Sequence, residues 1–208
     1  MCGRYSNEGT NVEQLVERFD AQPTLESFAP SANIKPTHTA PVVIEHKGQR
    51  ELHAMQWGLI PAWAKDPKIG YKTFNARAET IAEKPAFRHA FKHKRCLVPA
   101  RAFYEWLTEN GRKVPYSFSL EENELFAFAG LYDVWKTPSG EPLYTYTIIT
   151  TTPNELVEKV HNRMPVMLSP DAEAVWLDPN AADPDRLQAL LVPYDASLMA
   201  VQRYEGTL

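Results

Sequence analysis

The sequence has little cysteine, no long apolar run and no excess of basic charge. Only 2 of its 208 residues are cysteines, Cys2 and Cys96, which excludes a framework of disulfides as the source of stability. The apolar runs are too short to cross a bilayer, and the first residues lack the apolar stretch of a secretory signal. These absences predict a cytoplasmic protein without a membrane partner, whose two cysteines are free thiols.

The charge balance excludes a protein that binds polyanions over its whole surface. Lys and Arg number 22 against 26 Asp and Glu, which gives a formal net charge of −4. A site for nucleic acid must therefore be a local basic patch on a protein that is acidic overall.

Helical and strand-like patterns alternate along the chain. Val12, Leu15, Val16 and Phe19 have helical spacing after a polar start at Thr10 or Asn11, which predicts an amphipathic helix with an N-cap. Other helical segments are expected at about 79–92, after Pro153, after Ser169-Pro170 and after Asp183-Pro184.

Segments rich in β-branched and aromatic residues predict strands. They are "PVVIE", "LHAMQWGLI", "RCLVPARAFYEWL", "PYSFSL", "LFAFAGLYDVW" and "YTYTIITTT". With 44% hydrophobic residues and no change of composition along the chain, residues 1–208 are expected to form a single α+β domain. Its core is predicted to be a mainly antiparallel, barrel-like sheet flanked by short helices.

Cys2 is the first candidate for chemistry, although a single thiol can also be incidental. Removal of Met1 would expose an α-amine and a thiol on adjacent carbons. The α-amine has a pKa of roughly 7.7–8.0, so much more of it is neutral near pH 7 than of a lysine amine. Such a 1,2-aminothiol condenses with an aldehyde to an imine, and the thiol then closes a thiazolidine ring intramolecularly.

Asn75, Arg77 and Glu79 lie in "TFNARAET" and would share one face of an extended segment. The spacing alone favours a structural role for Asn75, as the cap of a following helix. The alternative is a binding role, because an amide both donates and accepts hydrogen bonds and would orient an amine or a sugar hydroxyl. Arg77 would then hold a phosphate in a forked contact.

Glu105 lies in "FYEWL", between Tyr104 and Trp106, in a stretch suited to burial. A buried carboxyl either pairs with a cation or has a raised pKa, and a raised pKa suits proton transfer near neutrality. A structural salt bridge and a catalytic acid/base therefore remain as alternatives for Glu105.

His161 and Arg163 lie in "VEKVHNRMPVML", where a helical segment gives way to a short strand. A histidine there either complements a helix C-terminus or serves as a second acid/base group. Arg163 is available to an anionic ligand. No metal site and no cofactor are expected, because the spacing of His89, His93 and Cys96 offers no fourth ligand.

Trp57 and Trp63 lie around a glycine and a proline in "MQWGLIPAWAKD". Core packing is the ordinary role of each tryptophan. On an exposed tip, either ring would stack on a base.

The order and wording of these segments resemble a known family. "MCGRY", "NIKPTHTAPVV", "WGLIPAWAKD", "NARAET", "RCLVPARAFYEW", "PYSF", "FAGLYDVW", "TIITTTPN" and "HNRMPVML" together are similar to the SOS response-associated peptidase family, the SRAP domain. The resemblance runs in consistent order from the N-terminus to about residue 170.

The resemblance implies a protein that senses abasic sites in single-stranded DNA and cross-links to them through Cys2. By similarity, Asn75 orients the reacting groups, Glu105 moves protons during imine formation, and His161 is an acid/base near the deoxyribose. By similarity, Arg4, Arg77 and Arg163 hold the flanking phosphates. Further candidates for contact with the DNA are Trp57, Trp63 and Thr151. A monomer is expected.

Two other functions compete with covalent capture. One is a thiol peptidase that removes its own N-terminal residue, with Cys2 activated by His161. The other is a reader of damaged single-stranded DNA that forms no bond to it.

Overall fold

The computed structural model describes residues 2–181, 183–206 and 208. Its helices are α1 (Val12–Phe19), α2 (Arg88–His93), α3 (Pro170–Leu177) and α4 (Pro184–Gln188), with 3-10 turns at Pro67–Tyr71, Ala78–Thr80, Glu121–Asn123 and Ala196–Leu198. Its strands are β1 (Tyr5–Ser6), β2 (Ala21–Pro23), β3 (Thr39–His46), β4 (Gln49–Trp57), β5 (Asn75–Arg77), β6 (Arg95–Ala100), β7 (Ala102–Glu109), β8 (Arg112–Leu120), β9 (Phe126–Lys136), β10 (Pro142–Thr151), β11 (Met164–Pro165), β12 (Met167–Leu168) and β13 (Met199–Arg203).

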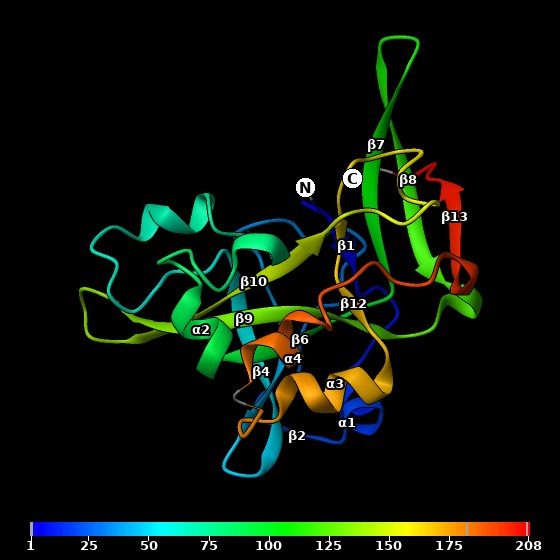
Figure 1. Cartoon of the computed structure of the whole chain (residues 1–208). Coiled ribbons are helices and arrows are strands. Elements are labelled where there is room, and N and C mark those ends of the chain that lie inside the picture. Colours follow the sequence, from blue (N-terminus) through cyan, green and yellow to red (C-terminus); the bar gives the residue numbers. More distant parts are fainter. Residues whose placement is uncertain (1, 182, 207) are drawn as a thin grey trace.

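A closed barrel of five strands forms the centre of the molecule (Figure 1). Its strands follow the order β10, β4, β3, β6 and β9, and β9 pairs back onto β10 to close the ring. The β4–β10 pairing is parallel, whereas the other pairings of the ring are antiparallel. The predicted α+β class with a mainly antiparallel barrel is confirmed.

A second, antiparallel sheet joins the N-terminal segment to the barrel. Its order is β1, β7, β8 and β13, and the hairpin of β7 and β8 projects from the body of the molecule (Figure 1). β1 pairs with β7, placing Tyr5 opposite Phe103, and Tyr5 also forms a bridge with Ile34. The hydroxyls of Tyr5 and Tyr146 lie 2.7 Å apart, so the N-terminal segment is fixed against β10.

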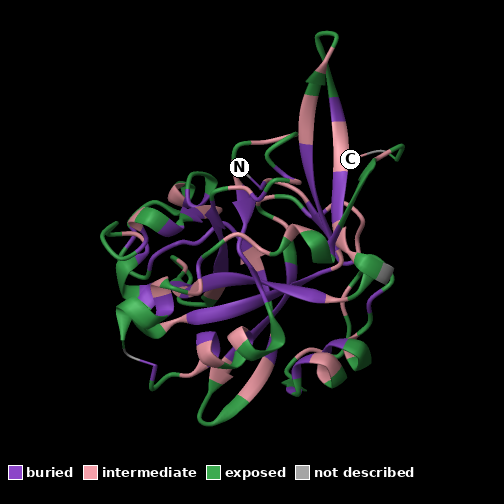
Figure 2. Cartoon of the chain, turned by 45° about the vertical axis from the view of Figure 1, so that its right-hand side comes forward, coloured by how far each residue is buried: buried purple, intermediate pink, exposed green. Residues whose placement is uncertain are grey.

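The central strands are largely buried (Figure 2). Their alternating residues form two hydrophobic clusters, because successive side chains of a strand face opposite sides. The outer faces carry Val43, Leu97 and Ile149, in one cluster with residues of the four helices. The inner faces carry alternate residues such as Val42, Ile44, Trp57, Cys96, Val98, Phe128, Tyr146 and Ile148. Cys2 and Tyr5 belong to this inner cluster.

The helix predictions have mixed outcomes. α1 is confirmed and begins with a capping box: the Asn11 side chain accepts from the Gln14 peptide N–H at 2.9 Å, and the Gln14 side chain accepts from the Asn11 N–H at 3.1 Å. α3 and α4 confirm the two proline starts. The helix expected at 79–92 is wrong in extent, because Pro85 separates the 3-10 turn from α2.

The segment after Pro153 forms turns and no regular helix. The Asn154 side chain accepts from the peptide N–H groups of Leu156 and Val157, at 3.2 and 3.0 Å. Both cysteines are buried free thiols, as predicted. None of the helices among the described residues is long and apolar enough to cross a membrane.

Candidate active site

Glu105 lies at the centre of the candidate site, on the same face of β7 as Phe103. Phe103 belongs to the inner cluster of the barrel, and Glu105 is only 3% exposed. Burial disfavours the ionised carboxylate and raises the pKa of Glu105 to about 7. This carboxyl therefore both gives and takes protons near neutral pH.

The His161 ring faces Glu105. Its Nε2 atom lies 3.8 Å from Oε2 of Glu105. Its Nδ1 atom lies 3.1 Å from the peptide nitrogen of Arg163 and 3.1 Å from the carbonyl oxygen of the same residue. The ring thus keeps a backbone partner in either state, because Nδ1 accepts from the N–H when unprotonated and donates to the carbonyl when protonated.

Burial lowers the pKa of His161 below its usual value. A neutral imidazole is therefore favoured beside a carboxyl that holds its proton more tightly than usual. Such a pair differs from an ion pair, because each partner retains the capacity to change protonation during a reaction.

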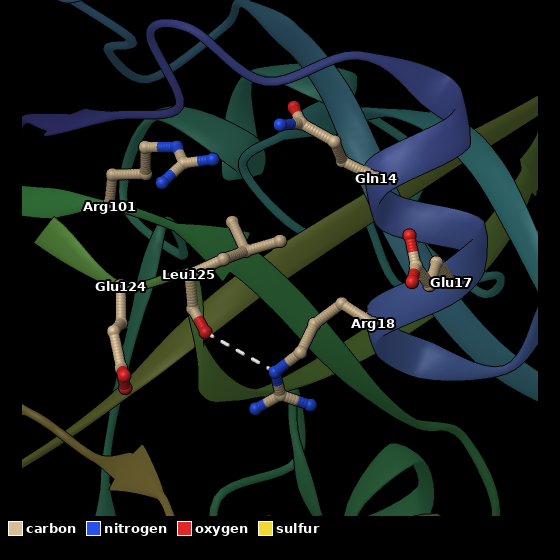
Figure 3. Close-up of a pocket in the computed structure, with 6 residues that line it drawn as sticks. All are labelled: Gln14, Glu17, Arg18, Arg101, Glu124 and Leu125. Carbon is tan, nitrogen blue, oxygen red and sulfur yellow. Dashed lines mark hydrogen bonds between the residues drawn. The ribbon is translucent and has the colours of Figure 1, made fainter.

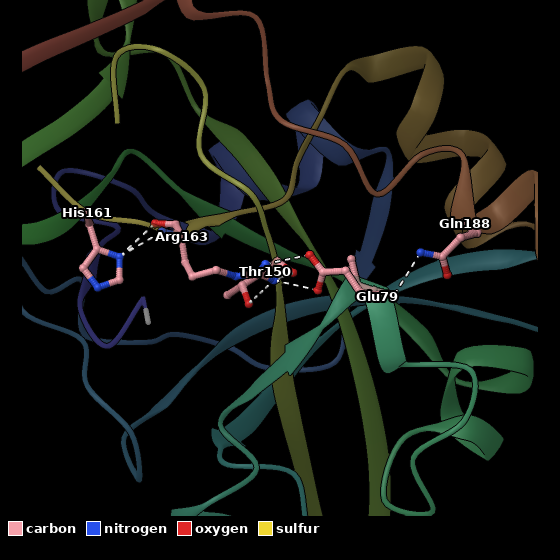
Figure 4. A network of polar contacts seen from close by, with 6 residues as sticks. Glu79, Thr150, His161, Arg163 and Gln188 are labelled. Carbon is pink, nitrogen blue, oxygen red and sulfur yellow. Dashed lines mark hydrogen bonds and ion pairs between the residues drawn. The ribbon is translucent and has the colours of Figure 1, made fainter. Parts of the chain in front are cut away.

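The side chain of Arg163 holds the turn that carries His161 (Figure 4). Its Nη1 and Nη2 atoms donate to the two carboxylate oxygens of Glu79 at 2.6 and 3.0 Å. Nη2 also donates to the carbonyl oxygen of Thr150 at 2.7 Å. The bidentate pair lowers the pKa of Glu79 and ties the His161 turn to both β10 and the segment after β5.

Cys2 is completely buried, and its thiol lies 3.7 Å from the carbonyl oxygen of Arg4, to which it donates. Burial raises the pKa of the Cys2 thiol, and the charge of Glu105 raises it further. The thiol is therefore protonated near neutral pH. Met1, whose removal the aminothiol chemistry requires, lies outside the described residues.

Asn75 begins β5, which pairs in parallel with β10 and places Asn75 opposite Ile148. Its side-chain amide donates to the carbonyl oxygens of Phe74 and Ile148, at 3.1 and 3.3 Å. The spacing-based prediction of a helix cap is therefore wrong. The Oδ1 atom is buried and accepts no hydrogen bond from the described residues, which leaves one acceptor for a ligand donor.

Arg4 and Arg77 are two further arginines, besides Arg163, among the predicted site residues. Nη1 of Arg4 donates to the carbonyl oxygen of Gly3 at 2.9 Å, while its buried Nε has no hydrogen-bond partner among the described residues. Arg77 is exposed at the end of β5, two residues after Asn75 and on the same face of the strand.

The aromatic candidates have different surroundings. Trp57 is completely buried, stacks on Tyr146 with ring centroids 6.2 Å apart, and donates from its indole N–H to the carbonyl oxygen of Phe74 at 2.7 Å. Its assignment to base stacking does not fit this burial, because neither face of the ring is open to solvent. Trp63 is 61% exposed, whereas Thr151 is buried at the end of β10.

The structure thus brings Cys2, Glu105 and His161 together and adds two residues that the sequence did not single out for this role. Glu79 and Thr150 fix Arg163, which carries the peptide groups that hold His161. Glu79 and Arg163 are 84 positions apart in the sequence. No local pattern signals such a pair.

Another hollow lies away from Cys2, between α1 and the start of β9 (Figure 3). It measures about 440 Å³ and is lined by Gln14, Glu17, Arg18, Arg101, Glu124 and Leu125. Arg18 binds Glu173 with two hydrogen bonds and Leu125 with a third. Arg101 donates to Thr10 and Asn123. Both cations therefore have structural partners.

Comparison with known proteins identifies the family of this chain. The model of the SOS response associated peptidase (SRAP) family matches residues 1–205. The chain belongs to the SRAP family. Within it, the chain is 48% identical over 202 residues to the abasic site processing protein YoqW of Bacillus subtilis, covering 96% of this chain and 90% of that protein.

More distant SRAP proteins include the abasic site processing protein HMCES of Xenopus tropicalis. It is 37% identical over 185 residues, covering 74% of this chain and 55% of that protein. A crystal structure of a protein from Bacteroides thetaiotaomicron superimposes with a TM-score of 0.90 at 29% identity, covering 97% of this SRAP chain and 91% of that one. The expected resemblance to the SRAP family is confirmed.

Proposed function

We propose that this SRAP protein processes abasic sites in single-stranded DNA by covalent capture of the ring-opened sugar aldehyde. Relatives named abasic site processing proteins support the substrate class. The observation that carries the proposal is the group of Cys2, Glu105 and His161, in which a buried thiol and a buried carboxyl with a pKa of about 7 lie with a half-buried imidazole.

The reaction begins with removal of Met1, which frees the α-amine of Cys2. The neutral amine attacks the aldehyde carbon and gives a carbinolamine, which loses its hydroxyl as water and becomes an imine. The Sγ–H then adds across the C=N bond: sulfur bonds to carbon, the proton passes to nitrogen, and a thiazolidine closes. One water is released overall, and no oxidant or reductant is needed.

Glu105 and His161 transfer the protons in this sequence. With a pKa of about 7, Glu105 is present both as the acid that protonates the departing hydroxyl and as the base that accepts a proton from the amine. His161, favoured as neutral, is the second base beside the sugar. The open acceptor of Asn75 orients the amine or a sugar hydroxyl.

Arginines around the group bind the phosphates that flank the lesion. Arg77 is exposed and Arg4 has a donor that is not used by the described residues. Arg163 shares its guanidinium with Glu79, so a phosphate there joins or replaces that carboxylate. Trp63 offers an exposed ring for a base, and Thr151 lines the strand end beside Arg163.

The raised pKa of Cys2 weighs against the thiol peptidase. A peptidase nucleophile is a thiolate with a lowered pKa, whereas burial and the charge of Glu105 favour the neutral thiol here. Thiazolidine closure tolerates a neutral thiol, because the amine attacks first and the sulfur follows within one residue.

The test is covalent attachment to a DNA strand that contains one aldehyde. A strand with a single uracil is treated with a uracil-removing glycosylase, mixed with the protein, and separated under denaturing conditions. The wild type should form an adduct whose intact mass equals the protein without Met1 plus the strand minus one water. The untreated uracil strand is the matched control and should not attach.

Variants distinguish the competing functions. Cys2→Ala should abolish the stable adduct, while Cys2→Ser should leave an imine that only borohydride makes permanent. Equal attachment of the untreated strand, or full adduct from Cys2→Ala, would refute covalent capture by the aminothiol. Binding that disappears on denaturation would identify a non-covalent reader.

A further inference from the structure

Two exposed aromatic rings, of Trp63 and Tyr71, lie just before and at the end of the 3-10 turn Pro67–Tyr71. Trp63 is 61% exposed and Tyr71 is 65% exposed, whereas large apolar side chains are ordinarily mostly buried. Both rings line a hollow of about 590 Å³, together with Lys65, Lys68 and Lys72. Aromatic faces among cations are the combination that binds single-stranded nucleic acid.

Tyr71 stands between two hollows. A second hollow, of about 440 Å³, is lined by Thr37, Gln56, Trp57, Lys68 and Tyr71, among others. Lys68 and Tyr71 line both hollows, so the two hollows meet at these residues. With 65% of its surface exposed, Tyr71 is open to a planar ligand.

The segment that carries these rings is anchored to the barrel. The Trp135 indole donates to the carbonyl oxygen of Ala64 at 2.8 Å, and both residues belong to a separate apolar cluster with Ile60. A Cβ on Gly70 would lie 2.9 Å from the carbonyl oxygen of Gly58, so the two glycines permit a close backbone approach. Rings on an anchored support lose little conformational freedom on binding.

Further hydrogen bonds fix the ends of the turn. The Asp66 carboxylate accepts from the Lys68 peptide N–H at 2.9 Å. The Thr73 hydroxyl lies 2.6 Å from the carbonyl oxygen of Leu59 and 2.9 Å from that of Ile69. Three exposed lysines against Asp66 make the segment locally basic in a chain whose formal net charge is −4.

Trp57 contacts both the second hollow and the residue next to Asn75. Trp57 lines this hollow, and its indole donates to the carbonyl oxygen of Phe74, the residue before Asn75. The Phe74 ring packs edge-on against Trp57 with centroids 6.1 Å apart. Trp57 therefore links the hollow that Tyr71 lines to the residue next to Asn75.

We propose that Tyr71, with Lys68 and Lys72, forms a subsite for an undamaged nucleotide next to the abasic site. The base stacks on the exposed phenol ring, and the lysines pair with the adjoining phosphates. This inference rests on the proposed function. It concerns the nucleotide beside the abasic sugar, which Cys2 does not contact. Stacking tolerates any base, because each base has a π-face, so the subsite reads the presence of a base rather than its identity.

The test measures non-covalent binding in the Cys2→Ala background, with a strand that carries a tetrahydrofuran analogue of the abasic site and so has no aldehyde. Fluorescence anisotropy of the labelled strand gives the Kd. Tyr71→Ala should weaken binding about tenfold, while Tyr71→Phe, which keeps the ring, should bind within twofold of the parent. Leu198→Ala, at another exposed apolar residue, is the matched control.

A second strand identifies the base as the partner. In it, the nucleotides on both sides of the analogue also lack bases, and Tyr71→Ala should then change the Kd by less than twofold. Lys68→Gln with Lys72→Gln should reduce the slope of log K against log salt by about 1.4, since each phosphate contact contributes about 0.7 on single strands.

An unchanged Kd for Tyr71→Ala on the base-bearing strand, or an equal loss on both strands, would overturn the subsite. Failure of the proposed function has a different signature: the wild type forms no adduct with aldehyde-bearing DNA, whatever the binding data show. If both proposals hold, Tyr71→Ala should raise the concentration of aldehyde-bearing strand needed for half-maximal adduct about tenfold, whereas Leu198→Ala should not.

Discussion

The Glu105→Gln variant should become more stable relative to the wild type as the pH rises. The side chain is 3% exposed, and burial raises its pKa from the ordinary 4.5 to about 7. That rise corresponds to a preference of about 3.4 kcal/mol for the protonated carboxyl in the folded state. Glutamine is close in shape to the protonated acid and cannot ionise.

The sign follows from the raised pKa. The contribution of Glu105 to stability is fully present below pH 4.5, where the carboxyl is protonated in both states, and it is lost as the pH rises through about 7. Between pH 5 and pH 8 the wild type should therefore lose about 2.5 kcal/mol that the Glu105→Gln variant keeps.

Urea unfolding followed by tryptophan fluorescence at pH 5, 6, 7 and 8 measures this difference. The free energy of unfolding of Glu105→Gln minus that of the wild type should increase by about 2.5 kcal/mol across the series. Glu155→Gln, at an exposed carboxyl, is the control and should show a constant difference. A constant difference for Glu105→Gln as well would refute the reasoning that burial holds the proton on this group.

Three further changes test other parts of the structure. Glu79→Gln removes the charged partner of Arg163; single-turnover adduct formation should slow about tenfold and its pH profile should shift, and an unshifted profile would contradict a positioning role. Gly130→Ala places a Cβ 2.8 Å from Sγ of Cys96; thermal unfolding should show a loss of about 1–3 kcal/mol, and combination with Cys96→Ala should restore part of it. Asn11→Ala removes the cap of α1 and should cost about 1 kcal/mol in urea unfolding; an unchanged midpoint would deny the cap an energetic role.

The strands were predictable because their side chains alternate or are uniformly apolar over local stretches. The antiparallel neighbours follow from short connections, such as the turn between β3 and β4. The parallel pairing that places Tyr146 opposite Trp57 has no local signal. It depends on strands almost 90 positions apart in the sequence, whose register is set by the barrel as a whole.

The site was predictable only in part. Glu105 was recognisable as a carboxyl in a stretch of buried residues, and its burial is confirmed. The spacing around Asn75 suggested a helix cap, but parallel pairing with β10 holds this residue in a strand, so tertiary structure overrides local preference. Tyr71 lay in no recognised motif, and no local pattern predicts that this aromatic side chain is 65% exposed.

The burial of Cys2 also protects its sulfur from oxidation and alkylation. Peroxides and alkylating agents attack thiolates that solvent can reach, and Cys2 has neither exposure nor a lowered pKa. Under the proposed function, in which this sulfur bonds once to DNA, burial keeps it in the reduced form until the strand arrives. Resistance to oxidation is then a consequence of the same packing that fixes the N-terminal segment in the barrel.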